Sequence, residues 1–128
     1  MTSPNAGEEY VFERTFTTED VRRFASLSGD TQPQHVEPDA DGRLMVHGLL
    51  TATLPTKIGG DLEVLAHTMT FTFHRPVYTG ESITCTWTHE DVEEREDRYV
   101  VSVAIDCRSE DGETVMSGSL SGIVWKGA

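Results

Sequence analysis

Cysteines and long apolar runs are scarce in this 128-residue chain, and each scarcity excludes a class of structure. The two cysteines, Cys85 and Cys107, are too few for a disulfide scaffold and too far apart in sequence for a zinc or redox motif. Each stands among alternating apolar residues, so both are predicted to be small buried hydrophobic side chains. No stretch is long and apolar enough to cross a bilayer.

The N-terminus also lacks the features of a targeting segment. Residues 1–5 are polar, and no apolar segment follows them as it would in a secretory signal peptide. We therefore expect a cytoplasmic protein. The length predicts one domain over residues 9–128, preceded by a flexible tail over residues 1–8.

Basic side chains are few as well. Twenty-two acidic residues face ten basic ones, which gives a net charge of −12. Nucleic acid and membranes are therefore excluded as partners, because binding to phosphate-rich surfaces needs a basic patch. Two explanations of the acidity stay open: solvated faces that keep the protein soluble, or adaptation to a salt-rich cytoplasm, which we favour because salt screens self-repulsion.

Local signals predict a strand and two helices in the first half of the chain. Residues 9–16 alternate as a strand does, and Thr17 with Asp20 forms a capping signature for a helix that ends at Gly29. Residues 29–46 have the composition of a loop. An apolar helix over 47–58 follows, with Gly59-Gly60 as its stop and Pro55 as a residue that bends it or ends its regular hydrogen bonding early.

The chain after Asp61 alternates with period two, which predicts strands in an antiparallel sheet. One face of this sheet is apolar and the other is rich in threonine, so the apolar face needs a cover. The helix over 47–58 is the long apolar element available. We therefore predict an α+β hot-dog fold, in which a curved antiparallel sheet wraps around a central helix.

Asp30 and His35 are the candidate catalytic residues. They lie five residues apart on a loop that Gly29 and Pro33 stiffen, so both side chains can face one small volume. A carboxylate and an imidazole suit the addition of water, because one removes a proton from water while the other supplies one to carbon. The alternative is that glycine, aspartate and proline serve here only as turn residues and that the histidine is solvated.

A second candidate group begins the apolar helix. Gly48 leaves its N–H uncrowded at a helix start, where it can bind the oxygen of a polarised thioester carbonyl. His47 is interpreted as a structural hydrogen-bonding residue at the helix start.

Three motifs in this order are Gly-Asp-x-x-Pro-x-His over 29–35, His-Gly-Leu-Leu over 47–50, and Phe-x-Phe-x-x-Pro-Val-x-x-Gly-Glu over 71–81. Together they resemble the MaoC-like dehydratase family, of the (R)-specific enoyl-CoA hydratase type. The resemblance covers residues 24–81. It implies dimers of hot dogs with the site at the subunit interface and the CoA arm along the surface.

The resemblance also implies roles for individual residues. Asp30 and His35 would hold and activate the water, and the Gly48 N–H would bind the thioester oxygen. Thr56 matches a position where the family often has a serine near the acyl site. Gln32, counted with His47 among the substrate-site residues, stands where the family usually has asparagine.

Gln34 is a second departure in the catalytic loop, at a position where the family usually has an apolar residue. The stretch between His35 and His47 is also shorter than is usual, and Pro55 interrupts the central helix. These last two segments would line the acyl pocket.

We therefore expect a hydro-lyase that reversibly hydrates a trans-2-enoyl-CoA, or a related acyl thioester, to the (R)-3-hydroxyacyl thioester. The CoA thioester is the substrate, no cofactor is expected, and the assembly is a homodimer. No metal is expected, because the spacings of His67, His74 and His89 do not converge. The alternatives are a hot-dog thioesterase, which would want a carboxylate on 47–60 where none occurs, and a non-catalytic acyl-CoA-binding or assembly subunit.

Overall fold

The structure, a computed structural model, describes residues 3–127. In chain order its elements are β1 (Glu9–Thr15), α1 (Thr18–Ser28), α2 (Pro33–Val36), α3 (Gly48–Thr51), α4 (Thr53–Asp61), β2 (Leu65–Phe73), β3 (Ser82–Glu94), β4 (Arg98–Ser109) and β5 (Thr114–Trp125). None of these helices is long and apolar enough to cross a membrane.

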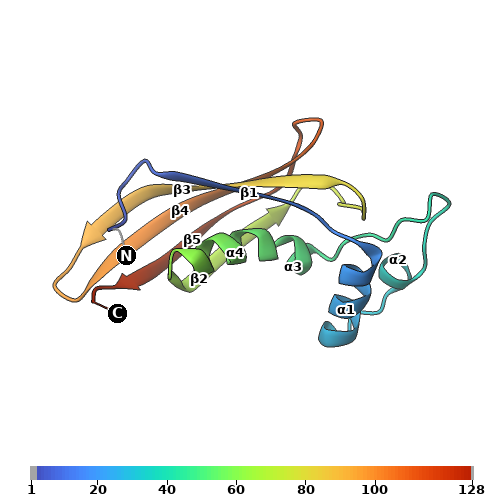
Figure 1. Cartoon of the computed structure of the whole chain (residues 1–128), viewed down its shortest axis with the longest axis horizontal. Helices are drawn as coiled ribbons and strands as arrows, with labels where there is room; N and C mark the ends of the chain where they lie inside the picture. The colour runs from blue at the N-terminus through green and yellow to red at the C-terminus, as the bar shows by residue number, and fades with distance from the viewer. Residues whose placement is uncertain (1–2, 128) are drawn as a thin grey trace.

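The five strands form one antiparallel sheet in the order β1-β3-β4-β5-β2. The sheet curves over α4, and α1 and α2 lie beyond one end of it (Figure 1). Leu54 and Ile58 of α4 are buried in the core that also holds Trp87. A Cβ added at Gly59 would lie 3.1 Å from the Trp87 ring, so glycine lets α4 approach the sheet closely. The predicted α+β hot-dog fold is confirmed.

The period-two pattern places the core side chains of β3 and β4 correctly. Cys85 and Cys107 are paired across these strands, and both are fully buried. The hydrogen bond with Cys85 and burial raise the pKa of the Cys107 thiol. Both cysteines are free thiols in the core, as the sequence predicts.

The predicted caps of α1 are also confirmed. The Thr17 hydroxyl accepts from the Asp20 N–H at 3.1 Å, and the Asp20 carboxylate accepts from the Thr17 N–H at 2.9 Å. Gly29 ends the helix with a φ of 80°, in the left-handed region that favours glycine.

The central helix differs from the prediction. The regular structure divides at Ala52 into α3 and α4, and α4 runs through Gly59 to Asp61. Pro55 has no N–H to donate to the preceding turn, and it lies in the first turn of α4, where this loss is tolerated. The prediction of a stop at Gly59-Gly60 was wrong, because α4 continues through both glycines to Asp61, with Gly59 packed against the Trp87 ring.

Two other segments are more ordered than their composition suggests. The loop over 29–46 contains the short helix α2, and a bridge between Met45 and Tyr78 ties the end of this loop to the segment between β2 and β3. Within the predicted tail, Gly7 donates to the His89 carbonyl at 2.7 Å, and His89 donates to the Glu8 carbonyl at 2.9 Å. The tail therefore runs along β3 from Gly7 onward.

Candidate active site

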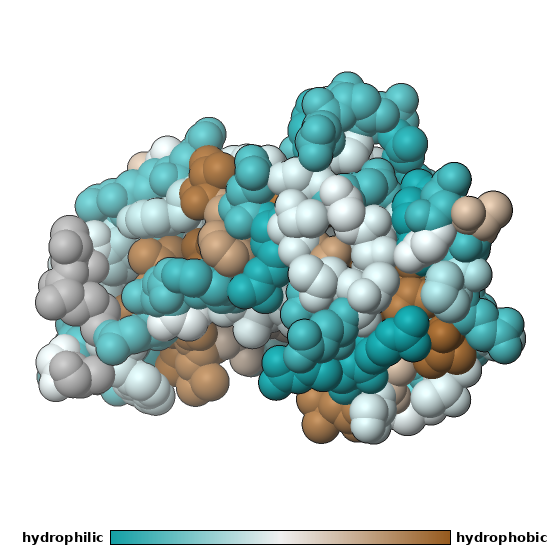
Figure 2. Space-filling model, turned by 45° about the vertical axis from the view of Figure 1, so that its right-hand side comes forward, coloured by the Kyte–Doolittle hydropathy of each residue, from teal (hydrophilic) through white to brown (hydrophobic). Residues whose placement is uncertain are grey.

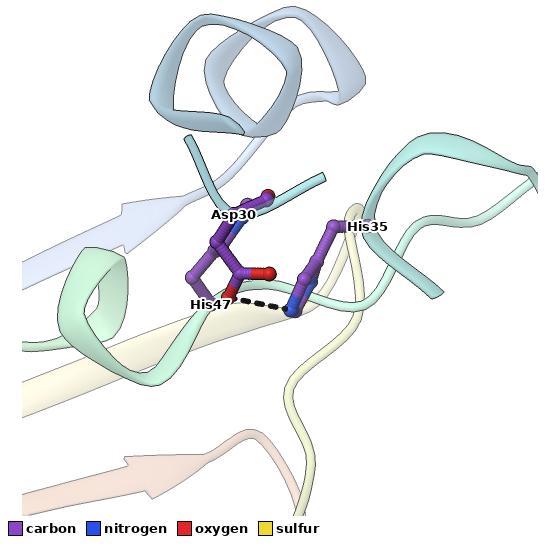
Figure 3. A group of neighbouring side chains, drawn as sticks. All are labelled: Asp30, His35 and His47. Atoms are coloured by element: carbon purple, nitrogen blue, oxygen red, sulfur yellow. Dashed lines mark hydrogen bonds and ion pairs between the residues drawn. The ribbon is translucent and has the colours of Figure 1, made fainter. Parts of the chain in front are cut away.

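Three segments bring the candidate side chains together. Asp30 follows the end of α1, His35 lies on α2, and His47 directly precedes α3 (Figure 3). The Asp30 N–H donates to the Ser28 hydroxyl at 3.1 Å, which fixes the turn out of α1. The predicted convergence of Asp30 and His35 is observed, and His47 joins them.

The His35 imidazole presents one bare nitrogen to Asp30. Its Nδ1 lies 2.7 Å from the Met45 carbonyl oxygen, and because a carbonyl only accepts, Nδ1 must carry the proton. In the neutral ring, Nε2 then has a free lone pair and lies 3.6 Å from Asp30 Oδ2. The His35 side chain is buried, whereas that of Asp30 is 39% exposed, so the pair opens to solvent on the Asp30 side.

The second oxygen of Asp30 is held by Gln32. Asp30 Oδ1 accepts from Gln32 Nε2 at 2.9 Å and from the Gln32 N–H at 3.4 Å. The side-chain bond is the main reason that the pKa of Asp30 lies below its ordinary value, and the nearby His35 and His47 act in the same direction. Gln34 in turn donates to Gln32 Oε1 at 3.3 Å. The two glutamines therefore form one chain of hydrogen bonds that orients the carboxylate.

His47 connects the segments that carry Asp30 and His35. Its Nε2 lies 2.9 Å from the Asp30 carbonyl oxygen and must be the donor. Its ring is stacked on the His35 ring, with centroids 3.7 Å apart and an interplanar angle of 15°. The Phe24 ring lies 4.9 Å from it, and Nδ1 is buried without a partner among the described residues. This geometry fits a structural role for His47.

Gly48 places a free N–H beside the pair. No acceptor for this N–H occurs among residues 3–127. A Cβ at Gly48 would lie 2.9 Å from Phe73 Cε1, so only glycine fits beside this ring without displacing it. Because α3 has only four residues, the N–H itself rather than a helix dipole provides the attraction for an oxyanion.

A cavity of about 770 Å³ joins these groups, and Asp30, His35, His47 and Gly48 all line it. Thr56 does not line it. The Thr56 hydroxyl donates to the Ala52 carbonyl at 2.9 Å instead, and the residue is exposed.

Lining residues that the sequence did not reveal include Phe24, His74, Arg75 and Val115. They come from α1, from the segment after β2 and from β5, so only the tertiary fold brings them together. The one available signal was that His74 and Arg75 lie inside the third motif. His74 is held by a hydrogen bond of 2.7 Å between its Nε2 and the Ser117 hydroxyl.

Asp30, His35 and His47 also offer metal-ligand atoms that lie within 4.8 Å of one another. The sequence-based interpretation did not consider this trio. Imidazole lone pairs lie in the ring plane, so two nearly parallel stacked rings direct their lone pairs side by side and not at one point. The arrangement fits proton transfer better than tetrahedral coordination.

Residues 2–110 match the family described as MaoC like domain. The chain belongs to the MaoC-like dehydratase family. It is 25% identical over 115 residues to the mitochondrial 3-hydroxyacyl-[acyl-carrier-protein] dehydratase of Arabidopsis thaliana, covering 80% of this chain and 66% of the relative. It is 24% identical over 123 residues to the mitochondrial dehydratase FERN of Solanum lycopersicum, covering 87% of this chain and 72% of that relative. The chain thus spans just under two thirds of the first relative.

Solved structures agree on the fold. The (R)-hydratase of A. caviae superimposes with a TM-score of 0.83 at 23% identity, over 95% of this chain and 98% of that one. The C-terminally truncated HadBC complex of Mycobacterium tuberculosis, a 3R-hydroxyacyl-ACP dehydratase, superimposes with a TM-score of 0.73 at 19% identity. The match covers 97% of this chain and 100% of that one.

Proposed function

We propose that this MaoC-like protein is a hydro-lyase that reversibly adds water to a trans-2-enoyl thioester to give the (R)-3-hydroxyacyl thioester. The observation that carries the proposal is the pairing of His35 Nε2 with Asp30 Oδ2, 3.6 Å apart, beside the free N–H of Gly48. Family membership and the names of the relatives support the same reaction class.

One water molecule bridges the pair in this mechanism. Two acceptor atoms 3.6 Å apart can each accept one hydrogen of the same water, which leaves the water's oxygen lone pair available to the substrate. The thioester oxygen accepts from the Gly48 N–H, which draws electrons from the double bond. The carbon farther from the thioester is then open to attack.

The bond changes balance without another reactant. The water oxygen forms the bond to the β-carbon as His35 Nε2 takes one of its protons, and the π electrons move toward the thioester oxygen. The enolate formed is stabilised by the Gly48 N–H. Collapse of the enolate takes a proton from the Asp30–His35 pair onto the α-carbon, which restores the pair. Both additions come from the side of the substrate that faces the pair.

In this proposal the active protein is a homodimer whose contact lies beside the site. β2 pairs with β5 on one side only, and Leu65, Met69 and Phe73 are 60%, 47% and 50% exposed along it. A second copy laid along this strand would cover them and narrow the cavity, which Phe73 and Leu49 line. Hydrophobic patches are visible between hydrophilic side chains in the view of Figure 2.

Thioester hydrolysis receives less support. The carboxylate on α3 and α4 is that of Asp61, which is ion-paired with Lys57. A cytoplasmic location remains part of the proposal, although both curated relatives are mitochondrial proteins.

The direct test mixes the protein with crotonyl-CoA and follows the absorbance of the conjugated thioester. The absorbance should fall toward an equilibrium, and the same equilibrium should be reached from (R)-3-hydroxybutyryl-CoA. Release of free thiol instead of hydration would support a thioesterase, and no reaction with either thioester would contradict the hydro-lyase proposal.

A further inference from the structure

The basic side chains of this acidic protein are distributed unevenly. Seven of the ten lie within 4 Å of a carboxylate: Arg43, Lys57, Arg75, Arg95, Arg98, Arg108 and Lys126. Within residues 3–127 the other three, Arg14, Arg22 and Arg23, have no such partner. The three unpaired guanidinium groups all come from the end of β1 and from α1.

Two of these arginines line a second cavity. It has a volume of about 380 Å³, and its walls include Arg14, Arg23, Phe24, Leu27 and Leu50. The Arg14 guanidinium lies 5.6 Å from the centroid of the Phe12 ring, a contact that leaves its N–H donors free. Arg22 does not line the cavity, and one of its N–H groups points to the Val36 carbonyl at 3.5 Å.

One carboxylate also lines this cavity, that of Asp20. The Asp20 carboxylate accepts the Thr17 N–H as part of the α1 cap, and among residues 3–127 it forms no ion pair with either arginine. Two cations therefore face the cavity against one engaged anion. Although the protein has a net charge of −12, the local charge at this cavity attracts an anion.

The second cavity adjoins the first. Phe24 lines both, and within α3 Leu49 lines the first cavity while Leu50 lines the second. A ligand with its thioester at Gly48 can thus extend past Phe24 and α3 toward the two arginines. β1 and β2 are opposite edges of the sheet, so a dimer formed along β2 leaves the arginine cavity accessible.

We propose that the cavity between Arg14 and Arg23 binds the phosphate group at the end of the pantetheine arm of the substrate. The inference rests on the proposed function, because it takes the substrate to be an acyl thioester. Guanidinium groups bind phosphate oxygens through paired N–H donors, and the apolar walls suit the dimethyl-bearing carbons beside that phosphate. Coenzyme A and a carrier protein both hold this phosphate, so either can supply it.

The test compares three thioesters with one acyl group: crotonyl-pantetheine, which has no phosphate, crotonyl-4′-phosphopantetheine, and crotonyl-CoA. The Arg14→Gln/Arg23→Gln variant should lose roughly tenfold in kcat/KM, mainly through KM, with both phosphorylated substrates, as expected for exposed charged hydrogen bonds. Its rate with crotonyl-pantetheine should stay that of the wild type. Arg22→Gln removes one positive charge at the position next to Arg23, outside the cavity, and should match the wild type with all three.

Two results would overturn the inference. An equal loss with crotonyl-pantetheine would mean that the arginines do not act on a phosphate, and a loss with crotonyl-CoA alone would assign them to the nucleotide phosphates. If the wild type hydrates none of the three, the proposed function fails and calorimetric titration decides: 4′-phosphopantetheine must bind more tightly than pantetheine, and the double substitution must remove the difference. Where the wild type is active, its rates with crotonyl-CoA and with a crotonyl-loaded carrier protein identify which carrier supplies the phosphate.

Discussion

Trp87 and His35 are both buried, but different interactions hold them. Trp87 lies in a core of apolar side chains between the sheet and α4, where burial is the main stabilising contribution. His35 lies on a four-residue helix and is held by one hydrogen bond to Met45 and by stacking on His47. The sheet therefore sets stability, while a few directional contacts in residues 29–48 set the geometry of the candidate site.

The largest effect on stability is expected in the sheet. Trp87→Ala removes the largest fully buried side chain and should lower the free energy of unfolding by about 3–5 kcal/mol, as such truncations commonly do. Val11→Ala, at a residue that is 63% exposed on β1, should change it by no more than about 0.5 kcal/mol. Urea denaturation measures both, and a loss at Trp87 as small as at Val11 would contradict this description of the core.

The next effect concerns activity and tests the directional contacts of the site, in contrast to the sheet core. Gly48→Ala places a methyl group 2.9 Å from the Phe73 ring, so the ring or the N–H of residue 48 must move. The rate of hydration should fall by roughly 10- to 100-fold. This loss is at or below that caused by removing an oxyanion donor outright, because the N–H is displaced and not lost. The Gly48→Ala/Phe73→Ala protein removes the collision and should recover part of the rate. Full activity of Gly48→Ala alone would exclude the proposed role of this N–H.

The sequence predicted the sheet better than it predicted the site. Alternation identifies strands because it reflects burial on one face, and capping residues act within one turn, so both signals are local. The central helix divides at Ala52 and continues past Gly59 to Asp61, and no such local signal marks either position.

In the site, Asp30 and His35 were found from their loop and from the resemblance. The stacking of His35 on His47 and the presence of His74 at the cavity join residues distant in sequence, and no local pattern encodes such contacts. Thr56 was expected near the acyl group because it matches a position where the family often has a serine, yet its hydroxyl is bound within the helix.

A third prediction concerns the edge strand. The wild-type protein should have twice the 14.2 kDa chain mass, and Met69→Glu should shift it toward the monomer, because a charge would be buried at the contact. Val11→Glu places the same charge on the opposite edge strand and should leave the dimer intact. Size exclusion with light scattering measures both, and a wild-type monomer with full activity would contradict the dimeric site.

The smallest effect is a shift in pH dependence. The Gln32 side chain is the main cause of the lowered pKa of Asp30, so Gln32→Ala should raise that pKa and move the acidic limb of kcat/KM to higher pH. The hydrogen bond from Gln32 stabilises the ionised Asp30 carboxylate, so its contribution is present at neutral pH and is lost as the pH falls and Asp30 is protonated. Gln34→Ala, which removes a donor to Gln32 and none to Asp30, should shift the limb less. An unchanged limb in Gln32→Ala would mean that another group controls it.

The central claim is that Asp30 and His35 act as one unit on a single water, and a double-variant cycle tests it most directly. Asp30→Asn and His35→Ala should each reduce turnover of crotonyl-CoA by about two to four orders of magnitude, the usual contribution of positioned acid–base groups. The double variant should be little worse than either single one, because groups that serve one transition state are not additive. Unfolding curves close to that of the wild type would show that the fold persists. Losses that multiply in the double variant, or single variants within a few-fold of the wild type, would contradict the claim.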